Sequence, residues 1–109
     1  MWGQDAPRRI FAYTKPTDMR KSFDGLLALV KQVFRDQDPY SGALFIFANR
    51  KRSYVKILAW DRTGFGLYAK RLERGRFEFP SEAVSQELSE QAFRFIMDGI
   101  ALGRRRAMR

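Results

Sequence analysis

SYVKILAWDRTGFGLYAKRLERGRFEFP, residues 53–80, holds two runs of β-forming residues on either side of a turn, which predicts a hairpin followed by a basic corner and a short third strand. The turn is Asp61-Arg62-Thr63-Gly64. Glycine adopts positive φ at little cost, so Gly64 is expected to close a three-residue loop flanked by Asp61 and Phe65. That register places Ile57 opposite Ala69.

The register assigns each side chain of the hairpin to one face of the sheet. The predicted core face carries Val55, Ile57, Ala59, Leu67 and Ala69. The opposite face carries Tyr54, Lys56, Leu58, Trp60, Tyr68, Lys70 and Leu72. Aromatic rings interleaved with lysines are typical of surfaces that contact phosphates and stack on bases. An ordinary exposed sheet face with half-covered rings fits the same pattern.

Length and composition indicate one globular domain of 109 residues, with a core at about 8–103, a flexible leader at 1–7 and a flexible basic tail at 104–109. The chain has no cysteine and no histidine, which argues against disulfides, triad hydrolases and zinc enzymes. No cofactor or metal site is expected. No apolar run approaches the roughly 18 residues of a membrane span, and cytoplasmic localisation is the simplest interpretation.

The net charge of +9 is concentrated in one segment. Residues 50–76 hold nine basic residues against Asp61 and Glu73, whereas residues 77–103 hold one arginine against five acids. A local cationic cluster favours a polyanion, usually nucleic acid, or an acidic protein. Solubility explains part of the total charge but not its concentration.

Hydrophobic periodicity predicts the remaining elements. A helix beginning at Thr17 or Asp18 has an apolar stripe at three- and four-residue spacing that comprises Met19, Phe23, Leu26, Leu27, Val30, Val33 and Phe34. The continuous apolar run of residues 43–49 is typical of a central strand buried on both faces. Ser89 is expected to cap a final helix that ends at Gly103.

Four carboxylates are candidates for a magnesium site, since a nuclease needs two or three converging acids. They are Asp18, Asp24, Asp61 and Glu73. Asp61 and Asp18 already have local functions, as a turn residue and a helix cap, and the other two are interpreted as solvated surface charges. A non-enzymatic protein with no catalytic residues is therefore the main expectation, and a Mg²⁺-dependent nuclease the minor alternative.

Three long segments resemble a known family: TDMRKSFDGL at 17–26, DPYSGALFIFANRKR at 38–52, and VKILAWDRTGFGLYAKRLERGRFEFP at 55–80. They are similar to the small accessory protein, often called TnpB, of the family-66 bacterial insertion sequences. The resemblance runs from about Arg8 to Leu102, with Phe79 where tryptophan is commoner in the family. It implies a bacterial mobile-element protein that acts in DNA transposition, a form of DNA recombination, beside a separate transposase.

The predicted fold is α+β: an antiparallel sheet of strands at about 8–14, 43–49, 54–60, 66–72 and 76–79, in the order β-α-β-β-β-β-α. A long helix packs its Phe23/Leu27/Val30/Phe34 stripe on one face, and a C-terminal helix covers an edge or end. The expected partners are DNA, in particular insertion-sequence ends, and the element's transposase, with no membrane. The candidate DNA-binding residues are Arg50, Lys51, Arg52, Tyr54, Lys56, Trp60, Tyr68, Lys70, Arg71, Arg74 and Arg76. An adaptor that binds the transposase without touching DNA is the alternative.

Overall fold

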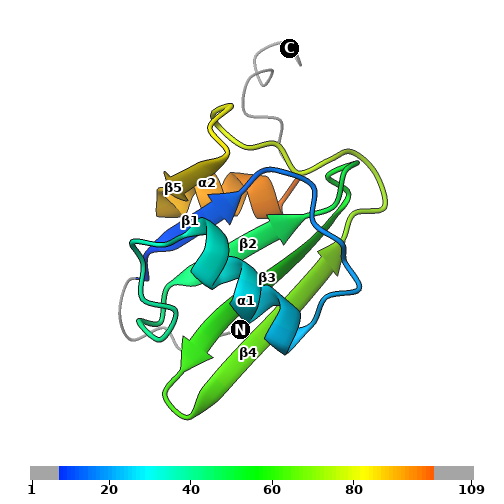
Figure 1. The fold of residues 1–109 in the computed structure, drawn as a ribbon. Coiled ribbons are helices and arrows are strands. Elements are labelled where there is room, and N and C mark those ends of the chain that lie inside the picture. Colours follow the sequence, from blue (N-terminus) through cyan, green and yellow to red (C-terminus); the bar gives the residue numbers. More distant parts are fainter. Residues whose placement is uncertain (1–7, 100–109) are drawn as a thin grey trace.

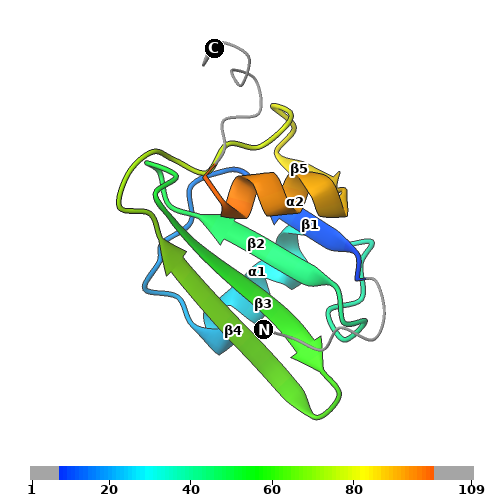
Figure 2. The same ribbon diagram turned by 180° about the vertical axis from the view of Figure 1, so that it is seen from behind.

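In a computed structural model, residues 8–99, the part of the chain that the structure describes, form a five-stranded sheet with a helix on each face (Figures 1 and 2). The elements are β1 (Ile10–Tyr13), α1 (Phe23–Val33), β2 (Leu44–Ala48), β3 (Tyr54–Asp61), β4 (Gly64–Arg71), β5 (Ser85–Leu88) and α2 (Glu90–Met97). The strands lie in the order β4-β3-β2-β1-β5. The α+β class and the element order are confirmed. No helix within this range is both long and apolar enough to cross a membrane.

Strand β2 lies at the centre of the sheet, as its apolar run predicts. All five of its residues are buried, because α1 covers one face of the sheet and α2 the other. Phe45 and Phe47 point to the face covered by α1 (the α1 face), and Leu44 and Ile46 point to the face covered by α2 (the α2 face). A strand that buries both faces has no need of alternating polar residues.

The sheet is mixed rather than wholly antiparallel. Three of its four strand pairings are antiparallel, but β1 and β2 run parallel, with Ile10 beside Leu44. The chain between these two strands forms α1, and a helical crossover returns the chain to the same end of the sheet, so the next strand points in the same direction.

Helix α1 begins later than the sequence predicts. Ser22 is its N-cap residue, and Asp18 instead pairs with the nearby Arg20 in the turn before the helix. The helix has 11 residues and therefore about three turns rather than four. Leu26 and Val30 are fully buried against the sheet, but Phe23, predicted to belong to the same buried stripe, remains 46% exposed.

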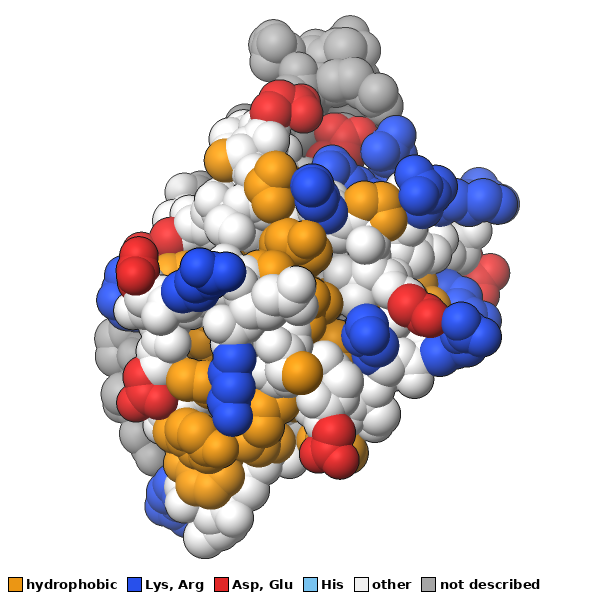
Figure 3. Space-filling view, viewed as in Figure 1, with side chains coloured by type: hydrophobic (Ala, Val, Ile, Leu, Met, Phe, Trp, Pro, Cys, Tyr) orange, Lys and Arg blue, Asp and Glu red, His pale blue; other side chains and the backbone are white. Residues whose placement is uncertain are grey.

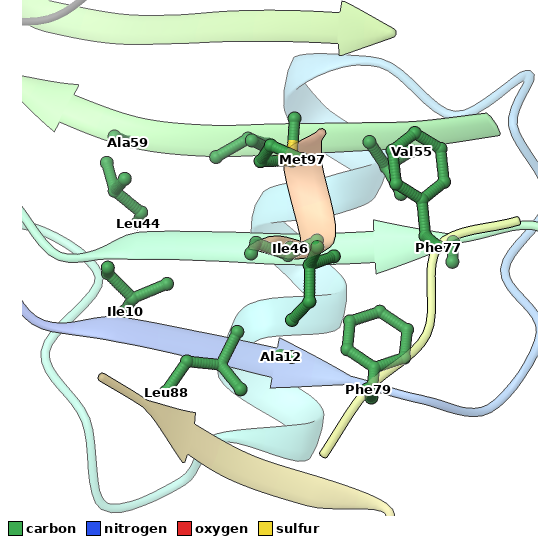
Figure 4. Packing of buried hydrophobic residues seen from close by; sticks show 13 residues of the cluster. Ile10, Ala12, Leu44, Ile46, Val55, Ala59, Phe77, Phe79, Leu88 and Met97 are labelled. Atoms are coloured by element: carbon green, nitrogen blue, oxygen red, sulfur yellow. The ribbon is translucent and has the colours of Figure 1, made fainter. Parts of the chain in front are cut away.

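The predicted strand at 76–79 is wrong. This segment lies outside the sheet and crosses the α2 face, where Phe77 and Phe79 are buried in the same cluster as Val55 and Ile46 (Figure 4). The fifth strand is Ser85–Leu88, which pairs antiparallel with β1. Its residues alternate between exposed and covered positions, but SQEL contains only one apolar residue, so its sequence gives little signal of a strand.

Helix α2 begins at the predicted cap. The Ser89 hydroxyl oxygen accepts a hydrogen bond of 3.0 Å from the Ala92 amide. The helix ends at Met97 and is followed by Gly99 at φ 74°, so it is shorter than predicted. The predicted end at Gly103, the leader 1–7 and the tail 104–109 lie outside the described residues.

Replacing Ser89 with alanine is expected to lower the free energy of unfolding by about 1 kcal/mol, because one amide of the first turn of α2 loses its partner. Urea denaturation measures the change. Ser22→Ala is the matched control, since Ser22 caps α1 without a side-chain hydrogen bond and its loss should be close to neutral. Equal costs at both positions would show that the capping bond is not the cause.

Candidate nucleic-acid interface

The turn between β3 and β4 contains two residues rather than three. Asp61 pairs with Gly64, and Ile57 faces Tyr68 instead of Ala69. Arg62, the first residue of the loop, has a φ of 60° and so provides the left-handed conformation that the sequence analysis assigns to Gly64. A non-glycine residue rarely adopts positive φ, which is why the sequence favours the glycine.

This shift of one residue moves every side chain of β4 to the opposite face. Phe65 and Leu67 join Tyr54, Lys56 and Trp60 on the α1 face, whereas Tyr68 and Lys70 lie on the α2 face. The predicted surface of aromatic rings interleaved with lysines is therefore wrong as one surface. Its members are divided between the two sides of the sheet.

Both sheet lysines bind backbone carbonyls of the protein itself. The Nζ of Lys56 donates to the carbonyl oxygen of Lys21, in the turn before α1, at 2.8 Å. The Nζ of Lys70 donates to the carbonyl oxygen of Met97, in the last turn of α2, at 2.7 Å. A cation at a helix C-terminus is stabilised by the helix dipole. These bonds tie the turn before α1 and the last turn of α2 to the sheet.

The three candidate rings also have partners within the fold. Trp60 is in contact with Phe65 and Tyr40, with centroid separations of 5.1 Å each. Tyr40, Trp60 and Phe65 form what we call the aromatic cluster, at the turn end of the β3–β4 hairpin. Figure 3 shows hydrophobic side chains gathered at the surface there. The ring of Tyr54 lies about 20 Å along β3 from Trp60 and is covered by Arg71, at 4.7 Å. Tyr68 packs against the core on the α2 face.

Six cations gather at the opposite end of the hairpin, where β2 ends, β3 begins and β4 ends. Figure 3 shows this concentration of Lys and Arg side chains at upper right. Backbone bonds bring the segments together: Leu72 N donates to Ser53 O, and Thr17 N donates to Ala48 O, both at 2.8 Å. All six side chains are exposed. We call this group the basic end; it comprises Lys15, Arg50, Lys51, Arg71, Arg74 and Arg76.

Lys15 belongs to the basic end but is not among the DNA-binding residues predicted from the sequence. The only local signal was Lys15-Pro16, which marks the end of a strand. Its position beside the β2–β3 turn depends on the hydrogen bond from Thr17 to Ala48, which connects residues far apart in the chain.

Arg52, one of the candidate phosphate contacts, holds together the loops of the basic end. Its φ is 57°, and its carbonyl oxygen accepts from Phe77 N at 2.6 Å. Its guanidinium group lies 5.1 Å from the centre of the Phe79 ring and donates to the Thr14 carbonyl oxygen at 3.4 Å. Arg52 thereby connects the β2–β3 turn to residues 77–79 and to the end of β1.

Three ion pairs neutralise cations elsewhere on the described surface: Arg9–Glu87, Arg20–Asp18 and Arg94–Glu90. The hydrogen bond from Arg20 lowers the pKa of Asp18, and that from Arg9 lowers the pKa of Glu87. Those carboxylates therefore stay ionised beside their partners. In contrast, no member of the basic end forms an ion pair with another residue of 8–99, so its positive field is not cancelled by close contacts.

The candidate carboxylates do not form a cluster. Within residues 8–99, no three acidic, histidine or cysteine side chains are close enough together to hold a metal ion. Asp18 binds Arg20, and Asp61 belongs to the two-residue turn.

The sequence of the chain matches a known protein family. The family model described as IS66 Orf2 like protein matches residues 8–107. The chain belongs to this family. The resemblance to the IS66 accessory protein, expected from about Arg8 to Leu102, is thereby confirmed, and the family is one of insertion-sequence accessory proteins.

Two relatives of this IS66 Orf2-like protein come from Sinorhizobium fredii (strain NBRC 101917 / NGR234). The uncharacterized protein y4jC is 33% identical over 101 residues, which cover 92% of this chain and 86% of the relative. The uncharacterized protein y4hO is 37% identical over 93 residues, which cover 84% of this chain and 80% of the relative. No solved structure matches the chain significantly.

Proposed function

We propose that this IS66 Orf2-like protein is a non-enzymatic accessory factor of transposition that acts in the bacterial cytoplasm and binds element DNA through the basic end. The observation that carries the proposal is a group of six exposed cations, none of which forms an ion pair with another described residue. Lysine and arginine side chains of this kind contact DNA phosphates and release counterions.

The geometry favours contact with the phosphate backbone of a duplex. Five of the six cations lie in loops and one, Arg71, at the end of a strand, and neither α1 nor α2 presents them. Within residues 8–99, these cations are therefore not carried by a helix that could place them in a major groove to read bases. Single-stranded binding uses open aromatic rings on which bases stack. The candidate rings Tyr54, Trp60 and Tyr68 each have neighbours in the fold, which argues against single-stranded binding. Since the remaining contacts are to the phosphate backbone, sequence preference should be modest.

The salt dependence of binding tests the proposal directly. Fluorescence anisotropy with a labelled insertion-sequence end and a scrambled duplex, over a series of salt concentrations, gives the slope of log K against log salt. Replacing Arg74 and Arg76 with glutamine should reduce that slope by about 2, because each lost phosphate contact removes about 0.9.

Lys31→Gln with Arg35→Gln is the matched control, since both side chains are exposed and the charge change is the same. This control should keep the wild-type slope. If the Arg74/Arg76 variant also keeps it, the basic end is not the DNA site. Preference of the wild type for the insertion-sequence end over the scrambled duplex would add recognition to binding.

The aromatic cluster favours a second candidate function, an adaptor for the transposase. Tyr40 is 48% exposed and contacts Trp60 and Phe65, so an apolar surface lies at the end of the hairpin away from the basic end. Aromatic rings are enriched where proteins bind each other. A pulldown of the transposase that survives nuclease treatment and is lost in Tyr40→Ala would support the adaptor, and the absence of any DNA-independent complex would oppose it.

A further inference from the structure

Strand β4 is a long edge strand. It has eight residues, pairs with β3 throughout its length without a bulge, contains no proline, and has no described strand on its outer side (Figures 1 and 2). Proteins usually protect such edges with proline, bulges or outward charges, because unpaired amides and carbonyls are a template for another strand. The other edge of the sheet, β5, has only four residues.

The hydrogen bond from Leu72 N to Ser53 O shows which backbone groups of β4 face outward. Peptide groups of an antiparallel strand alternate between its two sides, so Gly64, Gly66, Tyr68, Lys70 and Leu72 all face β3. The amides and carbonyls that face outward therefore belong to Phe65, Leu67, Ala69 and Arg71.

We propose that β4 pairs with β4 of a second copy of this chain, antiparallel, about a two-fold axis beside Tyr68. In that register Phe65 faces Arg71 of the second copy, and Leu67 faces its Ala69. It is the register that pairs all four outward-facing residues of both strands. A shift by two residues in either direction places one of the four opposite a residue beyond the strand.

The side chains favour a second copy in this orientation. Both cations of β4, Lys70 and Arg71, lie at the same end of the strand, so antiparallel pairing separates them from their counterparts, whereas parallel pairing would bring them together. The Nζ of Lys70 is already bonded to Met97 O and does not point out from the edge. Arg71 would meet Phe65, and an arginine over an aromatic ring is a favourable contact.

Leu67 and Phe65 add apolar area to such an interface. Both are only partly buried in one copy, on the α1 face, and Ala69 between Leu67 and Arg71 is exposed. A two-fold axis perpendicular to the sheet keeps the α1 faces of both copies on the same side. These partly covered side chains would then meet across the axis. The pairing joins two sheets into one and places the two basic ends far apart, and it does not depend on DNA binding.

Sedimentation of the full chain and amide exchange test the pairing together. We expect a mass twice the 12.8 kDa of one chain at high concentration. The amides of Leu67 and Ala69 should then exchange at least about 10-fold more slowly in the dimer than after dilution to the monomer, because pairing gives each an acceptor. A monomeric mass, or outward amides that exchange equally fast at every concentration, would overturn the proposal.

Ala69→Pro removes one outward amide without touching the ladder to β3, a position that an edge strand tolerates. We expect a monomer with the wild-type circular dichroism spectrum, and a dimer for the control Ala69→Thr. A folded, dimeric Ala69→Pro variant would overturn the pairing; if the variant does not fold, the wild-type exchange data decide. Protection of the outward amides only after addition of the transposase would assign the edge to that partner and overturn self-pairing.

Discussion

Replacing Phe77 with alanine is expected to lower the free energy of unfolding by about 3–5 kcal/mol, the range for truncating a fully buried phenylalanine. Phe77 is 0% exposed although it lies outside the strands, and its ring packs beside Val55 on the α2 face (Figure 4). Its amide also donates to Arg52 O. The variant therefore loses one of the two buried phenylalanine side chains that hold residues 77–79 against the sheet.

Phe23→Ala is the control for this prediction. Phe23 is also a phenylalanine that the sequence pattern places in a buried stripe, but it is 46% exposed, so its loss should cost less than about 1 kcal/mol. Denaturant unfolding of both variants gives the comparison. Equal destabilisation by the two substitutions would contradict the burial of the 77–79 segment.

The second large effect is expected on DNA binding. Replacing Arg50, Lys51, Arg74 and Arg76 with glutamine should weaken duplex binding by about 3.5 orders of magnitude in about 0.1 M salt, because each phosphate contact contributes about eightfold there through counterion release. Phosphate contacts carry no sequence information. The loss should therefore be the same for an insertion-sequence end and for a scrambled duplex.

A variant with the same change in charge is the control: Lys21, Lys31, Arg35 and Arg62 are exposed and are not members of the basic end. Replacing these four with glutamine should weaken binding by less than about tenfold, through the reduced long-range field alone. Similar losses in the two quadruple variants would mean that net charge, and not the basic end, governs binding. A loss confined to the insertion-sequence end would mean that these side chains read sequence.

Local patterns were sufficient to predict two kinds of element: a strand that is buried on both faces and a helix that begins at a strong cap. The apolar run of β2 predicts its central position, and Ser89 marks the start of α2. The buried positions of α1 follow from their spacing, apart from Phe23 at its first turn. In each case the signal and the structure that it predicts lie within the same few residues.

The register of the β3–β4 hairpin could not be predicted because the residue that takes the left-handed position is not the one that propensity favours. Propensity favours Gly64, whereas the structure uses Arg62 and a shorter loop. The shorter loop places Tyr68 and Lys70 against α2, where Lys70 bonds to Met97 O. Tertiary contacts of this kind outweigh the cost of about 1–2 kcal/mol for a non-glycine residue at positive φ.

Long-range pairing was the second source of error. Nothing in residues 85–88 indicates that they pair with β1, and the aromatic alternation of Phe77 and Phe79 is equally typical of a strand and of a loop that buries two rings. The basic end was predicted in part, because exposed loop cations are visible in the sequence. Lys70 was placed on the same surface as Lys56 because the predicted register puts the side chains of β4 on the wrong face.

The position of β1 between β2 and β5 has a consequence for synthesis on the ribosome. β1 is the first of these strands to be made, but its parallel neighbour spans residues 44–48 and its other neighbour residues 85–88. The β3–β4 hairpin connects residues close in sequence and can form early, whereas β1 must wait for both distant partners. A nascent chain that stops before Ser85 leaves one side of β1 open to pairing with other chains. The first strand synthesised is thus the last to be enclosed.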